Sequence, residues 1–472
     1  MQTVIVGNGI LAAAIAFRLT KRLAAKDRII IIGRRSRPGS ATLAAAAMLN
    51  SFAEIEAGSL NSELDRYRFE LSRTAARLWP QFEQEMAQAG AALPAGGGLE
   101  CGTYVINNAA ADDLDDENFD AIVAGLRQFG EPYEPVAPRD IPNYMPEQRH
   151  RATRALYIPS EGWMNPRLVM ERLDATLGRQ AQVSFVDDAV ASLARQGDRI
   201  GSARTESGEA IPGDQFVLAT GATASDVLRQ SKLGINVQRV FYGVGVSVEI
   251  RSPDFPHRKC IRTPNRGLAC GLYSVPYFTG AAQGDDHILV GASNFISPTP
   301  YPYGRLTSVD TLMRGAIEQL NRNFYRADLV RVNVGWRPTT LDTYPLLGKT
   351  SIGNLIIATG TKRDGFHLAP LIAEKIIAML FGEPLDKDFA RFAPERAPIR
   401  SLSRAEAIDK AVRHLINASY QHGFTPSRSR MPDQIAQMHR EDLERLHDKV
   451  GAHDWGIPPE MLDMYRYGHA VG

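Results

Sequence analysis

The sequence predicts an α/β protein with three parts. A domain with a parallel sheet is interrupted by an α+β domain with a mostly antiparallel sheet, and a C-terminal helical extension follows. Strands and helices alternate near both ends of the first 394 residues, β-rich segments predominate between them, and the chain becomes polar after Pro394. With 472 residues, the chain is long enough for two or three domains, because one domain usually has about 100–200 residues.

The first elements are a strand, a turn, a helix and a second strand. The β-branched run TVIVG at residues 3–7 predicts the first strand, and the apolar spacing of residues 10–23 predicts the helix. The run RIIIIG at residues 28–33 then predicts the second strand. This order is typical of a parallel α/β unit.

The turn between the first strand and the helix reads GNGILA, with the spacing G-x-G-x-x-A. Gly7 and Gly9 would let the backbone approach a pyrophosphate, and Ala12 is small enough for the helix to pack on the strand. The first helical residues, Ile10 and Leu11, would offer free N–H groups to the negative charge. The motif predicts a Rossmann-like dinucleotide site, and a plain tight turn remains the alternative.

The second strand ends in an unexpected residue for such a site. An Asp or Glu usually stands there and accepts hydrogen bonds from the ribose, but this chain has Gly33, followed by Arg34 and Arg35. The arginines could meet the 2′-phosphate of NADP, which would make the protein a nicotinamide dehydrogenase. Alternatively, backbone groups hold the ribose of a flavin dinucleotide while the arginines are solvated or stack on the adenine.

Composition excludes several classes of protein. Lys and Arg (54) nearly balance Asp and Glu (53), so no overall field favours nucleic acid or an acidic membrane surface. No apolar run approaches the roughly 18–20 residues of a membrane span, and no signal peptide is recognisable, so we expect a cytoplasmic protein. Cys101, Cys260 and Cys270 form no CxxC pair. We therefore expect buried thiols, with no disulfide and no zinc site.

Apolar spacing predicts the remaining elements. Residues 62–90 read as a helix, and the glycine-rich stretch 90–102 would lead into the second domain. Further β-rich segments are residues 182–186, 215–221, 242–250, 287–293 and 354–360. In the extension, amphipathic helices are predicted at 403–420 and 432–450. The histidines of that region match no familiar ligand spacing, so we expect no metal site there.

A run of small residues after the second strand gives the first sign of a family. The segment PGSATLAAAAML, residues 38–49, resembles a segment of the FAD-dependent amino-acid oxidases, which include glycine oxidase, D-amino-acid oxidase and sarcosine oxidase. In that family a Ser/Thr-Ala-Ala-Ala-Gly-Met pattern passes beside the pyrophosphate and the isoalloxazine, and here Ala47 replaces the glycine. The residues that the resemblance assigns to FAD in this segment are Ser40, Ala41, Thr42, Ala46, Ala47 and Met48.

Later segments resemble the same family in the same order, from about residue 1 to residue 394. PSEGWMNPRLVMERL at 159–173 looks like the family's Pro-x-x-Gly-x-x-x-Pro segment, and Val190 lies in the segment similar to its adenine-contacting strand. VLATGATAS resembles the family's Ala-Thr-Gly-Ala motif, so Thr220 and Gly221 would approach the dinucleotide. Residues 333–376 resemble the glycine oxidase signature. Its residues near the flavin would be Gly360, Lys362, Arg363, Asp364, Gly365, Phe366 and His367.

The resemblance favours a flavin over a nicotinamide. A nicotinamide enzyme needs none of these later segments. The resemblance therefore implies non-covalently bound FAD, with Gly33 and Arg34 at an altered ribose contact. Losing the acid removes one or two charge-assisted hydrogen bonds, each worth roughly 1.5–3 kcal/mol. We therefore expect weaker retention of FAD during purification.

The resemblance also assigns catalytic roles. It implies that Arg337 grips a substrate carboxylate in two parallel hydrogen bonds, that Tyr273 closes over the substrate, and that Arg363 precedes the flavin-binding helix. In this family a hydride passes from the substrate α-carbon to flavin N5, and water hydrolyses the resulting imine. We therefore expect oxidation of a small amine or amino acid, with O2 reoxidising the flavin to give H2O2.

Two other functions stay open at this point. Electrons could pass to another acceptor, as in an amine dehydrogenase, or the chain could be a non-catalytic flavoprotein-like binding subunit. We expect the FAD-binding domain to comprise residues 1–84, 152–228 and 333–396, and the substrate domain residues 85–151 and 229–332. The extension, 397–472, would either pack on the parent domain or mediate homo-oligomer contacts, or it would reach over the active-site mouth.

Overall fold

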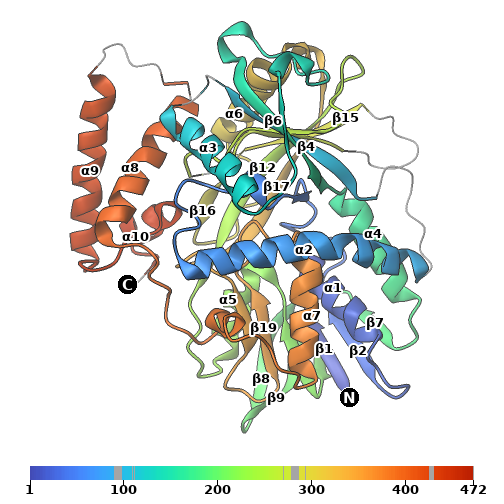
Figure 1. Ribbon diagram of the computed structural model, residues 1–472. Coiled ribbons are helices and arrows are strands. Elements are labelled where there is room, and N and C mark those ends of the chain that lie inside the picture. Colours follow the sequence, from blue (N-terminus) through green and yellow to red (C-terminus); the bar gives the residue numbers. More distant parts are fainter. Residues whose placement is uncertain are drawn as a thin grey trace.

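The computed structural model describes residues 1–89, 98–108, 110, 112–268, 270–277, 286–292, 294–421, 423–424 and 430–470. They form two large sheets, one above the other in Figure 1, with the C-terminal helices along one side. The predicted fold class is confirmed, because one sheet is almost entirely parallel, the other is mostly antiparallel, and helices follow them.

The first sheet has six strands in the order β18-β19-β11-β1-β2-β7, and only the edge strand β18 is antiparallel to its neighbour. Its central strands are buried on both faces, which explains their continuous apolar runs. Their bounds are β1 (Gln2–Val6), β2 (Arg28–Ile32), β7 (Val183–Val186), β11 (Gln215–Leu218), β18 (Leu346–Lys349) and β19 (Leu355–Thr359).

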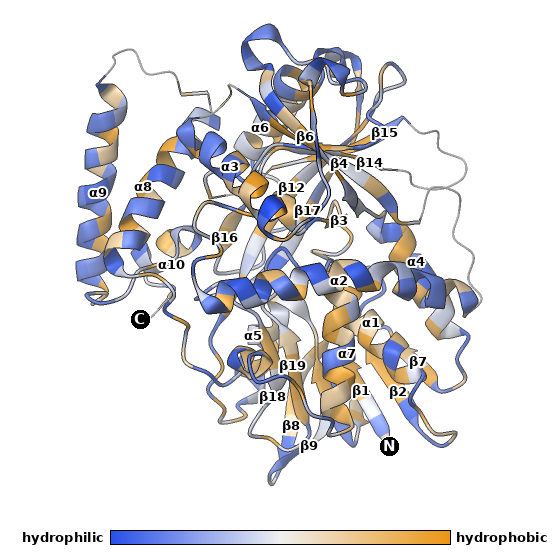
Figure 2. Cartoon of the chain, viewed as in Figure 1, coloured by the Kyte–Doolittle hydropathy of each residue, from blue (hydrophilic) through white to orange (hydrophobic). Residues whose placement is uncertain are grey.

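Helices cover one face of this sheet, and a smaller sheet with one helix covers the other. On the first face α1 and α7 are hydrophobic along most of their length, which fits their burial (Figure 2). These helices are α1 (Ile10–Thr20), α2 (Glu63–Gln88), α4 (Pro166–Gly178) and α7 (Ala369–Leu380). The other face carries α5 (Ala224–Ser231) and the strands β8 (Val190–Gln196), β9 (Arg199–Thr205) and β10 (Ala210–Pro212).

The second sheet follows the path β16-β12-β15-β14-β13-β4-β6-β3, with β17 paired to β12 and β5 to β6. Neighbours are antiparallel except β13 and β4. The strands are β3 (Met48–Leu49), β4 (Glu100–Asn108), β5 (Glu134–Val136), β6 (Ala152–Trp163), β12 (Val240–Arg251), β13 (Cys260–Arg262), β14 (Tyr273–Pro276), β15 (His287–Gly291), β16 (Phe295–Ser297) and β17 (Asp328–Thr340). Two longer helices lie beside this sheet, α3 (Asp113–Gln128) and α6 (Leu306–Gly315).

The extension packs on the main body as a helical layer. It comprises α8 (Arg404–Gln421), α9 (Met431–Lys449), the short turn η8 (Pro459–Met461) and α10 (Leu462–Arg466). Its apolar residues form one cluster with Phe241 and Leu341 of the main body. His447 is buried there, and its ring nitrogens bond to backbone groups of Leu443 and Ile457 at 2.8 and 3.1 Å. That histidine therefore holds the turn after α9.

Most predicted elements are confirmed, including the helix at 62–90, the five β-rich segments and both extension helices. The long helix begins after Ser62, whose hydroxyl accepts the N–H of Asp65 at 3.0 Å. Residues 90–97 of the glycine-rich stretch lie outside the described residues. The expectation of three buried thiols is wrong for Cys101, which is exposed on β4, whereas Cys260 and Cys270 are buried.

The predicted domain bounds stay a prediction, but the strand pairing shows which sheet β6 and β17 belong to. β6 begins at Ala152 and pairs with β4, so the chain leaves the second sheet only after Trp163. β17 belongs to the same sheet as far as Thr340. Every helix in the described part of the chain is too short or too polar to cross a membrane.

Removing the extension is expected to destabilise the main body. A chain that ends at Arg400 would uncover Phe241 and Leu341, and exposing each large apolar side chain costs about 1.5–3 kcal/mol. Thermal unfolding should show a lower Tm and increased binding of a hydrophobic dye. A chain that ends at Ala470 is the control, and equal Tm values for the two shortened chains would contradict this expectation.

Candidate active site

One cavity of about 930 Å³ lies where the two sheets meet. Its lining comes from the turn before α1, the end of β2, the small-residue run, the loop after β11, and β17 with the loop after β19. It brings together all the predicted site residues except Ala12 and Gly360. Ala12 is fully buried in the core beside the first sheet, and the residue that follows Gly360, Thr361, lines the cavity in its place.

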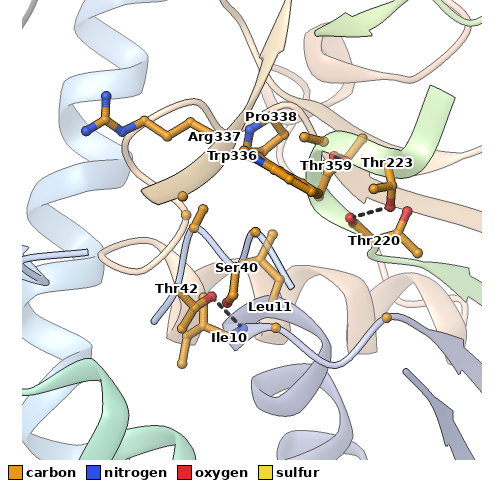
Figure 3. Close-up of a pocket in the computed structure, with 18 of the residues that line it drawn as sticks. Ile10, Leu11, Ser40, Thr42, Thr220, Thr223, Trp336, Arg337, Pro338 and Thr359 are labelled. Atoms are coloured by element: carbon orange, nitrogen blue, oxygen red, sulfur yellow. Dashed lines mark hydrogen bonds between the residues drawn. The ribbon is translucent and has the colours of Figure 1, made fainter. Parts of the chain in front are cut away.

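The glycine turn forms one end of the cavity. Gly7 has φ +114°, and a Cβ there would lie 2.4 Å from the carbonyl oxygen of Ala219. The N-cap of α1 is Gly9, which provides no side-chain cap. The N–H of Ile10 donates to Thr42 Oγ1 at 3.2 Å, so the small-residue run is attached to the start of the helix (Figure 3). This arrangement provides a helix N-terminus that can accept a pyrophosphate.

The side chain of Asn8 occupies the space beside Gly33, where an Asp or Glu side chain would usually lie. A Cβ on Gly33 would lie 2.5 Å from Cγ of Asn8, whose amide donates to the carbonyl of Arg34 at 2.8 Å. Arg34 lines the cavity but forms an ion pair with Glu206, and the Arg35 guanidinium lies over the ring of Phe185 at 5.7 Å. Since a 2′-phosphate would have to displace Glu206, these contacts favour the flavin explanation over NADP.

Three polar side chains in the lining have buried atoms without a partner among the described residues. They are Thr220 Oγ1, both side-chain polar atoms of Asn50, and His367 Nδ1. Burying such groups without hydrogen bonds is costly, so they are suited to a ligand with donors and acceptors. Burial lowers the pKa of His367, so its ring is neutral at pH 7. The cavity, the uncapped helix and these atoms fit a dinucleotide such as FAD.

The small-residue run bends sharply beside this site. Ala47 has φ +47°, a backbone conformation that glycine adopts with the least strain. Glycine is the residue that the family pattern has at this position. Its carbonyl accepts the N–H of Met164 at 3.1 Å. The substitution of alanine therefore keeps the backbone bend, at the expense of local strain.

Arg337 and Tyr273 line the same cavity. Along β17, Trp336 extends toward Thr220 and Arg337 extends the opposite way (Figure 3). Arg337 crosses Gly245 of β12, where a Cβ would lie 2.5 Å from its Nη2, and it donates to Asn294 at 3.2 Å. Burial raises the pKa of Tyr273, so its phenol is neutral. The structure thus places a guanidinium and a phenol together in the lining.

Acidic and basic side chains gather beside them. Glu54 lines the cavity and pairs with the buried Arg262, which also donates to Asn265 at 2.8 Å. Burial works against the charge of Glu54, but Arg262 and Arg363 outweigh it and hold the pKa of Glu54 below its usual value. The carboxylate is therefore ionised at neutral pH.

A buried carboxylate, that of Glu161, positions the turn that carries Glu54. Glu161, on β6, accepts the N–H groups of Ser51, Phe52 and Ala53. Burial raises the pKa of Glu161 to about 7 despite these donors. β6 thereby holds the turn η1 (Phe52–Glu54) against the cavity.

Sequence reasoning missed several lining residues. Asn8, Asn50, Glu54 and Glu206 were not among the predicted residues, although Asn50 directly follows the family's small-residue run. Gly245 of β12 leaves the space in which the guanidinium of Arg337 lies, a contact that the sequence analysis did not use. Among the described residues, no group of three or more His, Cys, Asp and Glu side chains could hold a metal ion.

Residues 2–379 match the family model described as FAD dependent oxidoreductase. The chain belongs to this family. FAD is accordingly its cofactor, and the chain is an oxidoreductase. The family match ends before the extension begins.

Relatives in the FAD dependent oxidoreductase family share limited identity with the chain. It is 26% identical over 404 residues to the Bifunctional protein ThiO/ThiG of Nostoc sp., covering 84% of this chain and 55% of that protein. A second protein of that name, from Trichormus variabilis, is 30% identical over 203 residues, and 28% of its length is covered. Glycine oxidase of Geobacillus kaustophilus is 24% identical over 399 residues, which cover 83% of this chain and 96% of that protein.

A solved structure shares the fold of this FAD dependent oxidoreductase. Iminodiacetate oxidase from Chelativorans sp. BNC1 superposes with a TM-score of 0.69 at 20% identity, covering 84% of this chain and all of that one. At this identity the likeness concerns the fold.

Restoring the usual acid at the end of β2 is expected to weaken FAD binding. In Gly33→Asp the new Cβ would collide with Asn8, so the Kd of the apoprotein for FAD should rise roughly tenfold, a change of about 1.4 kcal/mol. Fluorescence titration of the apoprotein with FAD measures it.

Two further variants complete this test. Asn8→Gly combined with Gly33→Asp should recover affinity, because the colliding side chain is gone. Gly353→Asp is the control, since nothing lies within 4 Å of a Cβ there. Tighter FAD binding by Gly33→Asp with Asn8 in place would contradict our explanation of the missing acid.

Proposed function

We propose that this FAD dependent oxidoreductase oxidises a small amine or amino acid that carries a carboxylate, and that O2 is the final electron acceptor. One observation carries the proposal. The cavity that holds the predicted dinucleotide residues continues to Arg337, whose guanidinium lies in the lining together with Tyr273. The relatives named glycine oxidase and iminodiacetate oxidase support a carboxylate-bearing amine as the substrate class.

The residues of the chain would act by binding and orientation. When bound, FAD supplies the group that accepts a hydride from the substrate α-carbon. Arg337 binds the carboxylate in two parallel hydrogen bonds and so fixes the direction of the α-carbon. Tyr273, neutral and buried, covers the substrate and excludes water. No general base is required if the amine arrives neutral.

We place the FAD contacts at the predicted residues that line the cavity. The pyrophosphate would lie at Gly7, Gly9 and the start of α1, and the adenine near Val190. The flavin would lie between the small-residue run and the loop after β19. The N–H groups of Gly365, Phe366 and His367 would face its N1–O2 edge.

Arg337 is the residue on which this function depends. Arg337→Met should lower kcat/KM for a carboxylate-bearing amine by about 10²-fold, because two charge-assisted hydrogen bonds are lost. An amine without a carboxylate should change by no more than about threefold, since it makes neither bond. Anaerobic bleaching of the flavin with a panel of amines and amino acids identifies the substrate for these measurements.

Controls separate the parts of the proposal. Arg331→Met changes an exposed arginine of the same strand and should leave kinetics unaltered. Formation of peroxide under air tests O2 as acceptor, and its absence with normal bleaching indicates a dehydrogenase instead. If no amine or amino acid bleaches bound FAD, amine oxidation is wrong.

A further inference from the structure

Arg363 lines the cavity, yet the carboxylates around it have other partners. Within the described part of the chain, its side chain donates no hydrogen bond, and its one ion pair, from Nη2 to Glu56 Oε1, spans 3.9 Å. Its side chain is 23% exposed, so the guanidinium is neither fully buried nor solvated. Burial works against its charge, but the nearby carboxylates Glu54 and Glu56 outweigh it and raise the pKa of Arg363. A charged group whose donors make no hydrogen bond to any described residue thus borders the cavity.

Each carboxylate near Arg363 lies closer to a different cation. Glu54 pairs with Arg262. Glu56 lies 3.4 Å from Lys410 Nζ and also accepts from Asn265 at 3.2 Å. Because these contacts are shorter than the 3.9 Å to Arg363, the carboxylate of Glu56 is held on the side of Lys410.

The two other acidic side chains near Arg363, those of Glu460 and Asp364, also pair with other cations. Glu460 pairs with Lys362, and Asp364 lies 3.2 Å from Arg68. Burial opposes ionisation of Glu460, but Lys362 and Arg363 outweigh it and keep the pKa of Glu460 below its usual value. Among the described residues, Arg363 is therefore the cation of this group whose nearest paired carboxylate, Glu56, lies farthest away, at 3.9 Å.

Two members of this cluster belong to the C-terminal extension. Lys410 lies on α8 and Glu460 in η8, beyond the residues that match the family model. α8 also fixes the loop before β14, because His414 Nδ1 accepts the N–H of Leu268 at 3.1 Å and Asn417 accepts that of Gly267 at 2.7 Å. The extension therefore contacts Lys362 of the cavity lining and also the segment that precedes β14.

We propose that Arg363 binds a second anionic group of the substrate, besides the carboxylate at Arg337, and that Lys410 of the extension is a positioning residue that keeps Glu56 away from Arg363. The inference rests on the proposed function. It assigns the substrate to amines that carry two acidic groups. Without Lys410, Glu56 would close on Arg363 and compete with the substrate for its donors.

Binding of dicarboxylates to the oxidised holoenzyme tests this assignment without turnover. Malonate, succinate and glutarate are titrated against the monocarboxylates of equal chain length, with the absorbance of bound FAD as readout. At least one dicarboxylate should bind about tenfold more tightly than its monocarboxylate, because it makes one more charge-assisted contact. Equal affinities across all three pairs would overturn the assignment.

Variants of Lys410 identify its role. Lys410→Gln should abolish the roughly tenfold preference, whereas Lys410→Arg should retain it. The double variant Lys410→Gln with Glu56→Gln should restore the preference, because the neutral amide no longer competes for Arg363. A merely structural role of Lys410 would leave the double variant as impaired as the single one, and that result would overturn the proposal.

A matched control lies on the same helix. Arg413 pairs with Glu117 of α3 instead of with the cavity cluster, so Arg413→Gln should keep the dicarboxylate preference. Thermal unfolding of each holoenzyme verifies folding. Failure of the two proposals is distinguishable: absent flavin bleaching counts against amine oxidation, while absent dicarboxylate preference counts against Arg363 whether or not bleaching occurs.

Discussion

The parallel strands of the first sheet end along one edge, and the dinucleotide site depends on that constraint. Parallel strands that share a sheet bring their carboxyl ends together, whatever their distance in the sequence. At this edge the cavity receives Val6 from β1, Ile32 from β2, Ala219 after β11 and Thr359 from β19. Backbone geometry alone therefore assembles segments from the beginning, the middle and the end of the chain around one cavity.

Close contact between the small-residue run and β17 joins this edge to the second sheet. Gly39, with φ +64°, has no room for a Cβ, which would lie 2.3 Å from the ring of Trp336. The N–H of Trp336 donates to the carbonyl of Gly39 at 2.9 Å, and Gly335 lies against Ala41 and Ala44. The alanines of this run thus serve packing as well as access of the cofactor. Because Arg337 follows Trp336, this contact also determines where the guanidinium that we propose to bind a carboxylate lies.

Contiguous motifs were predictable from the sequence, whereas contacts between distant segments were not. The glycine turn, the small-residue run and the loop after β19 each carry their signal within a few residues, so nearly all the predicted residues line the cavity. The reason for Gly33 was not visible, because it depends on the side chain of Asn8 in another turn. Likewise, the partner of Glu54 is Arg262, 208 residues away. No periodicity or spacing predicts such a pair.

The extension illustrates the same limit, since its helices were predictable but its contribution to the charge of the cavity was not. Its amphipathic pattern predicted the two helices and left open whether they pack on the parent domain or reach over the active-site mouth; the cluster around Phe241 and Leu341 agrees with packing. The pattern gives no sign of the pairs that Lys410 and Glu460 form with main-body residues. A buried charge that loses its partner is strongly destabilising or seeks another partner nearby. Loss of Lys410 or Glu460 would leave Glu56 or Lys362 without that partner, so the packing of these two residues of the extension and the charge of the site are physically linked.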